Sequence, residues 1–252
     1  MITADSTRRL GAHLNDIGAV INLVLHDVKP GPASELWSRF DSTLDALHAI
    51  IDCFVERGLA RHTRLYFDDN YRSFYDLVLG SADLSHFAEV VVAVPISSLG
   101  RPPHGQLADL DQARSKGVRI AAHGYTHRRL ADYDARGTRL PTPPGGRYGP
   151  PATTSAPLTE NEVLYQLVET AERTDLFGAG REFVLPYGCY NATTLALNDR
   201  LRLFDHLSTT DFDLDVGQLL RPRLLITSTD TPDLLLARIL SEVESPPCPN
   251  HP

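Results

Sequence analysis

Short apolar runs alternate with amphipathic segments along most of the chain, and this alternation restricts the folds that the chain can form. The apolar runs have the length and the β-branched or aromatic content of buried strands. They are residues 20–26, 63–69, 89–95, 118–123, 181–186, 203–208 and 223–228. Strands that alternate with helices form parallel βαβ units. We therefore expect an α/β fold whose parallel sheet is either a barrel or a doubly wound layer.

Amphipathic helices are predicted between or after these runs, at residues 34–58, 106–117, 158–174, 190–201 and 231–243. In the longest of them, apolar residues recur every three or four positions and define one face: Leu36, Phe40, Leu44, Leu47, Ile51 and Phe54. Gly117 is expected to close the second helix, and Thr159 to cap the third. A length of 252 residues suits one large α/β domain, although length alone would also permit two. We expect residues 1–252 to form a single domain.

Two stretches break this rhythm. Residues 137–158 are so rich in proline and glycine that they are predicted to form a loop rather than regular structure. The loop follows the sequence HGYTH, which makes it a candidate lid; an insertion without function is the alternative. Residues 245–252 are expected to be a frayed tail.

The composition excludes several classes of protein. The formal net charge is −8 and the pI is about 5.6, whereas a nucleic-acid-binding surface has to be basic. Neither a signal-peptide-like stretch nor a run of 18 apolar residues is present, so we expect a cytoplasmic protein without a membrane segment. Cys53, Cys189 and Cys248 are odd in number and far apart, which argues against disulfides and against a zinc ribbon.

Two motifs offer the ligands of a mononuclear metal site. Asp68 and Asp69 follow the run RLYF, while His123 and His127 lie in HGYTH after the run VRIAA. In a parallel barrel both motifs would emerge at the carboxyl-terminal rim, with Gly124 letting the chain turn so that His127 points back. One carboxylate and two imidazoles suit a divalent ion such as zinc, and the second carboxylate can take a proton. Taken singly, each pair would more often be structural; their shared position favours a metal site.

Two further motifs end predicted strands. PYGCYN, residues 186–191, predicts a tight turn with free backbone N–H groups, which can stabilise an oxyanion. An ordinary strand-to-helix turn is the alternative reading of the same residues. His26 ends the first strand, in LVLHDV. If that strand lies in the same barrel, His26 can protonate a leaving amine; a plain hydrogen-bonded histidine is the alternative.

These four motifs, in this order, resemble those of the polysaccharide deacetylases, the NodB-homology group of carbohydrate esterase family four. The signature of that family runs TFDDG, then H-x-x-x-H, then a turn similar to PYG. The resemblance extends from VINLVLHDVKP to RPRLLITS and implies a distorted (β/α)₇ barrel. The position of LHDV near the N-terminus resembles the motif order of the biofilm poly-N-acetylglucosamine deacetylases.

The resemblance also implies a role for each residue. Asp69, His123 and His127 would hold the metal, expected to be zinc, with cobalt, nickel, manganese and iron as alternatives. Asp68 would be the general base, and the backbone N–H of Tyr187 would form the oxyanion hole. His26 would be the general acid.

The chain departs from the family pattern at three places. Asn70 replaces the glycine of TFDDG, and asparagine tolerates a positive φ. Val184 replaces the arginine that steadies the base, a role for which we name Arg223 instead. The tryptophan that walls the pocket in some members is missing from residues 210–215. The metal site therefore looks intact, and the substrate pocket altered.

The expected function is metal-dependent hydrolysis of an amide, removing an N-acyl group from an amino sugar or a sugar-bearing metabolite. N-acetyl is the expected acyl group, and the partner is a small molecule or a glycan. Two alternatives stay open. A decayed deacetylase would only bind a carbohydrate or a partner. The same three ligands form the facial triad of non-haem iron oxygenases, but those enzymes usually have all-β scaffolds.

Overall fold

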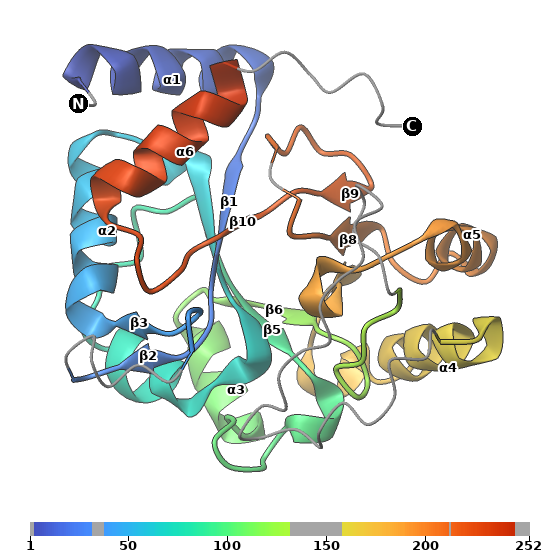
Figure 1. Cartoon of the computed structure of the whole chain (residues 1–252). Helices are drawn as coiled ribbons and strands as arrows, with labels where there is room; N and C mark the ends of the chain where they lie inside the picture. Colours follow the sequence, from blue (N-terminus) through green and yellow to red (C-terminus); the bar gives the residue numbers. More distant parts are fainter. Residues whose placement is uncertain (1–2, 32–37, 132–157, 212, 245–252) are drawn as a thin grey trace.

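The computed structural model describes residues 3–31, 38–131, 158–211 and 213–244 (Figure 1). Its main feature is a curled sheet of eight strands in the order β10-β1-β4-β5-β6-β7-β8-β9, all of whose pairs are parallel. The strands are β1 (Ile21–Leu25), β4 (Thr63–Phe67), β5 (Glu89–Val94), β6 (Arg119–Ala122), β7 (Glu182–Val184), β8 (His206–Ser208), β9 (Leu220–Arg221) and β10 (Leu224–Leu225). A separate two-stranded sheet joins β2 (Val28–Lys29) to β3 (Ser42–Thr43).

The two edges of the large sheet belong to one short segment of chain. β9 pairs with β8 at one edge, and β10 pairs with β1 at the other, yet only Pro222 and Arg223 separate them. Proline has no N–H for a strand ladder, which fits the interruption at this point. Counting β9 and β10 as one divided strand gives seven positions around a barrel. The expected distorted (β/α)₇ barrel is therefore confirmed.

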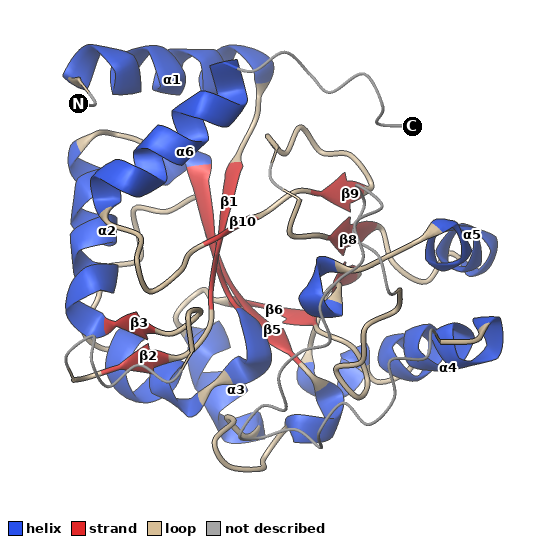
Figure 2. Cartoon of the chain, in the orientation of Figure 1, coloured by secondary structure: helices blue, strands red, loops and turns tan. Residues whose placement is uncertain are grey.

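The described residues form six α-helices, and Figure 2 shows that these helices surround the strands. They are α1 (Ala4–Ile17), α2 (Leu44–Glu56), α3 (Leu107–Ser115), α4 (Glu160–Ala171), α5 (Ala192–Leu201) and α6 (Pro232–Glu244). Short turns of helix connect them: η2 (Ala60–His62), η3 (Asp68–Asn70), η4 (Phe74–Val78), η5 (Ile96–Ser98), η6 (Thr174–Phe177) and η7 (Pro186–Gly188). Among the described helices, none combines the length and apolar character that a membrane crossing requires.

The strands from β1 to β7 in the large sheet are largely buried on both faces, and the two faces differ in character. The outer face joins the helices in the large core, to which Leu65 and Phe67 of β4 belong. The inner face carries a small separate cluster that includes Tyr66 of β4 and Ala121 of β6. Because side chains alternate along a strand, residues two positions further on point to this same inner side. Asp68 and His123 occupy those positions.

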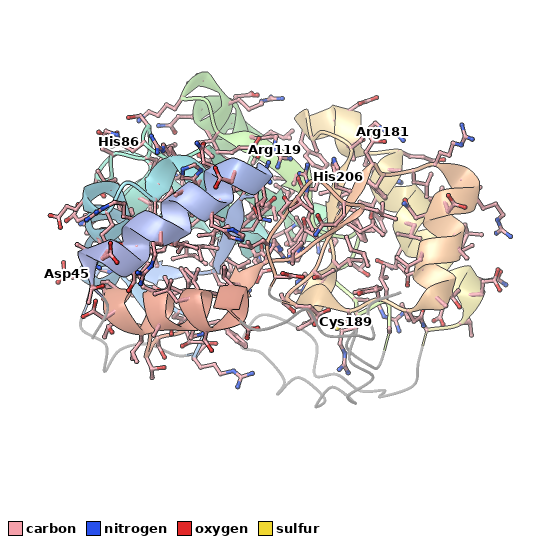
Figure 3. The ribbon with its side chains drawn as sticks, turned by 90° about the horizontal axis from the view of Figure 1, so that it is seen from above. Asp45, His86, Arg119, Arg181, Cys189 and His206 are labelled. Atoms are coloured by element: carbon pink, nitrogen blue, oxygen red, sulfur yellow. The ribbon has the colours of Figure 1, made fainter. Side chains whose placement is uncertain are left out.

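A charge network centred on the buried Glu182 lies on the same inner side of the strands, nearer their amino-terminal ends. Glu182 accepts hydrogen bonds from Arg119 (2.6 Å), Arg221 (2.8 Å) and the Tyr66 hydroxyl (2.9 Å). In Figure 3, Arg119 lies near the middle of the molecule, whereas Asp45 lies at its edge. The network explains why charged residues occur in strands that are otherwise apolar: each carboxylate is paired.

The structure corrects several predictions of secondary structure. The helix predicted over 34–58 begins only at Leu44, where the Thr43 hydroxyl accepts a hydrogen bond from the Ala46 N–H at 3.1 Å and forms an N-cap. Residues 38–43 form a turn and β3 instead.

No element was predicted before residue 20, yet α1 is a helix with the side chain of Thr3 as its cap. The predicted strands 203–208 and 223–228 shorten to β8 and β10. The loop 137–158, apart from its last residue, and the tail 245–252 lie outside the described residues.

Candidate metal centre

The predicted site residues gather at the carboxyl-terminal edge of the parallel strands. Asp68 and Asp69 directly follow β4, and His123 directly follows β6. Tyr187 follows β7 by a few residues, and His26 directly follows β1. Since these strands are parallel members of one sheet, their ends meet at the same mouth of the barrel.

Asp69, His123 and His127 point their ligand atoms at one another. Oδ1 of Asp69 lies 3.1 Å from Nε2 of His127 and 3.4 Å from Nε2 of His123, and the two Nε2 atoms are 3.2 Å apart. Ligands placed 2.0–2.1 Å from a tetrahedral zinc ion lie about 3.3 Å from one another. Oδ1 of Asp69 is buried and has no hydrogen-bond partner among the described residues, which is costly for a carboxylate oxygen. The three residues therefore fit a divalent ion.

The orientation of His123 is fixed by the backbone of β7. Its Nδ1 lies 2.8 Å from the carbonyl oxygen of Val184. A carbonyl can only accept, so Nδ1 carries the proton and Nε2 keeps the lone pair that a metal requires. The imidazole is almost fully buried, with 2% of the residue exposed. Val184 thus contributes through its main chain at the position where the family pattern has an arginine.

The loop after His123 turns the second imidazole back toward the first. Gly124 has φ 82°, and a Cβ there would lie 2.9 Å from Cγ of Pro186, so glycine is required on both counts. Gln166 of α4 accepts hydrogen bonds from both the N–H and the hydroxyl of Thr126, each at 3.1 Å. These contacts hold His127 at φ 52°, and the predicted reversal of the chain is confirmed.

Left-handed backbone conformations concentrate at this site. Five non-glycine residues among those described have positive φ, and four of them belong to the site: Asp69, Asn70, His127 and Tyr187. Each such residue costs of the order of 1–3 kcal/mol unless its surroundings hold it. The φ of Asn70, 56°, agrees with the expectation that asparagine can replace the glycine of TFDDG.

Asp68 is held by a buried arginine. Nη1 of Arg223 donates to both carboxylate oxygens of Asp68, at 2.8 and 3.1 Å. Nε of Arg223 donates to the carbonyl oxygen of Thr209 at 3.0 Å, and the guanidinium lies over the Tyr66 ring, 5.0 Å from its centroid. The contact predicted between Arg223 and Asp68 is confirmed, although Arg223 lies between β9 and β10 and Val184 lies in β7.

The electrostatics keep the carboxylates charged and one imidazole neutral. Burial alone would raise the pKa of Asp68, but the charges of Arg223, His123 and His26 hold that pKa below its ordinary value. Burial alone would also raise the pKa of Asp69, but the neighbouring imidazoles of His127 and His123 hold that pKa well below its ordinary value. Burial lowers the pKa of His127 to about 4. Asp68 is therefore ionised, so that its carboxylate is free to accept a proton, and His127 is neutral, as a metal ligand has to be.

His26 and Tyr187 lie at the same mouth of the barrel. Nδ1 of His26 is buried and has no hydrogen-bond partner in the described ranges, and the ring lies 5.5 Å from that of Phe40. His26 makes no hydrogen bond to the metal triad within the described part of the chain. Tyr187 has φ 61°, and its ring lies 4.9 Å from that of His127. The N–H of Tyr187 has no backbone acceptor among the described residues, as the turn prediction requires.

Comparison with solved structures identifies the fold. A de-N-acetylase from Aggregatibacter actinomycetemcomitans superposes with a TM-score of 0.68 at 15% identity, covering 87% of this chain and 99% of the other. The deacetylase PplD of Streptococcus pyogenes, in complex with acetate, gives 0.65 at 15% identity, with coverage of 90% and 99%. A polysaccharide deacetylase from Bacillus cereus gives 0.63 at 12% identity, with coverage of 88% and 69%. This chain has the fold of the polysaccharide deacetylases. No protein-family model and no curated protein matches its sequence.

Two residues that contact the site, Gln166 and His104, were not predicted from the sequence. Gln166 lies in a predicted helix, and nothing in its pattern indicates that it binds the loop of His127. His104 lies in the loop RPPHG, yet its Nδ1 is 2.7 Å from the carbonyl oxygen of Asp69. Both contacts span at least 35 residues of sequence, and local patterns carry no signal for such contacts.

Proposed function

We propose that this chain is a metal-dependent N-deacylase of the polysaccharide deacetylase family, and that it removes an N-acetyl group from an amino sugar in a small molecule or a glycan. One observation supports this most directly. Asp69, His123 and His127 have the spacing of zinc ligands, and Asp68 is a buried carboxylate next to them that does not belong to this group. Arg223 holds Asp68 in place. The likeness to enzymes named as de-N-acetylase and deacetylase supports the same reaction.

Asp69, His123 and His127 would hold the ion, expected to be zinc, which polarises an acyl carbonyl and lowers the pKa of water when bound. Asp68 accepts the proton of the attacking water, because it is ionised at neutral pH and Arg223 fixes its orientation. The free N–H of Tyr187 donates to the oxygen on which negative charge develops. His26 donates a proton to the departing amine, since an unprotonated amide nitrogen is a poor leaving group.

The decayed-deacetylase alternative arose from Val184, where an arginine would steady the base. Arg223 makes that contact from the short segment between β9 and β10, and its Nη1 reaches both carboxylate oxygens of Asp68. The oxygenase alternative disagrees with the fold, because the triad lies on a parallel α/β barrel. These observations favour hydrolysis over both alternatives.

The test is a screen of zinc-loaded protein against N-acetyl and other N-acyl amino sugars, with released amine and released acid both quantified. Equal amounts of the two products are expected, with the reaction abolished by a chelator and restored by added zinc. The matched variant is Asp68→Asn, which keeps the shape of the side chain and removes the proton acceptor. It is expected to retain zinc and to lose about 10²–10⁴-fold in kcat. Normal turnover by Asp68→Asn would show that Asp68 is not the base.

A further inference from the structure

A short loop segment, Pro103–Gly105, forms several hydrogen bonds to the turn that contains Asp69. The N–H of Gly105 donates to the carbonyl of Asn70 at 2.8 Å, and the N–H of Arg72 donates to the carbonyl of Pro103 at 2.8 Å. The side-chain amide of Asn70 donates to the carbonyl of Gly105 at 3.1 Å. We call this segment the 103–105 clamp. It follows Asn70 by more than thirty residues, so its contacts are tertiary rather than local.

His104 is the member of the 103–105 clamp that reaches the metal-binding residue itself. Its Nδ1 lies 2.7 Å from the carbonyl oxygen of Asp69. A carbonyl oxygen has no proton to give, so Nδ1–H is the donor. The His104 ring also stacks on Tyr71, with centroids 5.3 Å apart and planes 27° apart. Packing on one face and a hydrogen bond at one edge together fix the imidazole.

The approach between clamp and turn is too close for a side chain at position 105. A Cβ on Gly105 would lie 2.5 Å from Cε2 of Tyr75 and 3.0 Å from Oδ1 of Asn70. The hydroxyl of Tyr75 donates to that same Oδ1 at 2.5 Å. Asn70 is therefore held on both sides of its amide, by Gly105 and by Tyr75. Asn70 therefore tolerates a positive φ and also fixes the turn through the hydrogen bonds of its side chain.

The 103–105 clamp contacts two residues whose backbone conformation is intrinsically unfavourable. Asp69 has φ 69° and Asn70 has φ 56°, two consecutive left-handed residues. Rotation of Asp69 toward an ordinary conformation would carry its Oδ1 away from the two imidazoles. In the described part of the chain, the hydrogen bond from His104 opposes that rotation at the Asp69 carbonyl.

We propose that His104 is a positioning residue for the metal centre. Its hydrogen bond to the Asp69 carbonyl, backed by the rest of the 103–105 clamp, presets the carboxylate and so sets the affinity for the ion. The proposal rests on the proposed function, because it takes Asp69, His123 and His127 to be the metal ligands. It adds a determinant of affinity that lies outside those ligands and outside the reacting groups.

The experiment measures zinc affinity by competition with a chromophoric chelator, together with the absorption spectrum of the cobalt-substituted protein. The variants are His104→Ala and His104→Asn, since Nδ2 of asparagine occupies nearly the position of the histidine Nδ1. His48→Ala is the matched control, because His48 is a partly exposed histidine on α2 with one side-chain hydrogen bond, to Ser81 at 3.3 Å. Thermal unfolding of the metal-free proteins separates affinity from stability.

We expect zinc binding to His104→Ala to be about 10–100-fold weaker, as is typical when a partner of a metal ligand is removed. His104→Asn should recover most of that loss, and His48→Ala should bind like the unmodified chain. If His104→Ala folds poorly, Tyr75→Phe tests the same clamp, with a smaller loss expected. Unchanged affinity and an unchanged cobalt spectrum in His104→Ala would overturn the proposal while leaving the proposed function intact. Failure of the unmodified chain to bind zinc would overturn both.

Discussion

Replacing Arg223 by methionine, which keeps a long side chain without its charge, tests whether Asp68 depends on its partner. Both side chains are almost completely buried, and Nη1 of Arg223 contacts both carboxylate oxygens. Removing one partner of a buried ion pair costs about 3–5 kcal/mol, because the other charge stays uncompensated. Against a total stability of about 5–15 kcal/mol, that loss is easily measured.

A double-mutant cycle isolates the energy of this pair. Arg223→Met, Asp68→Asn and the double variant are unfolded in urea as metal-free proteins, so that metal affinity does not enter the comparison. Each single variant leaves one buried charge alone, whereas the double variant leaves none. The double variant should therefore be more stable than the sum of the single losses predicts, by about 1–3 kcal/mol. Losses that add within about 0.5 kcal/mol would refute the reasoning, since the two groups would then be independent.

Two further predictions concern the proton donor and the buried charge network. His26→Ala should lose about 10²–10⁴-fold in kcat on N-acetyl substrates but little on an activated acetate ester, whose leaving group needs no proton; equal losses on both substrates would argue against His26 as the acid. Burial alone would raise the pKa of Glu182, but Arg119 and Arg221 lower it to about 2, from an ordinary 4.5. A depressed folded-state pKa stabilises the protein above the unfolded value, and that stabilisation is lost as pH falls toward the folded value. The difference in unfolding free energy between the unmodified chain and Glu182→Gln should therefore shrink by about 3 kcal/mol between pH 5 and pH 2, and a difference that is independent of pH would contradict the assignment.

The parallel α/β arrangement and the gathering of Asp69, His123 and His127 could be predicted from local patterns, whereas the choice of a barrel over a doubly wound layer came from the family resemblance. Asp69 and His123 each come directly after a strand, and parallel strands bring their carboxyl ends to one mouth. Gly124 next to His123 indicated the turn that returns His127. Arg223 was predicted from the absence of an arginine at Val184, and the hydrogen bonds bear out that contact.

What could not be predicted depends on contacts between distant residues. The start of α2 at Leu44 is set by Thr43, which belongs to β3 and pairs with Lys29 of β2. The apolar spacing of Leu36 and Phe40 continues the helical pattern N-terminally, so the pattern alone placed the start too early. The contact of His104 could not be predicted for a similar reason. Its partner is the backbone carbonyl of Asp69, and every residue has such a carbonyl, so the side-chain sequence does not indicate which one is bound.

The account depends most on one ion being held by Asp69, His123 and His127. X-ray absorption spectroscopy of the zinc-loaded protein, combined with metal analysis, tests this directly. We predict one ion per chain, surrounded by nitrogen and oxygen atoms at about 2.0–2.1 Å, with the scattering pattern of two imidazoles. In the double variant His123→Ala, His127→Ala the ion and that pattern should both be lost. Retention of the ion in the double variant, or sulfur among its ligands, would contradict the account.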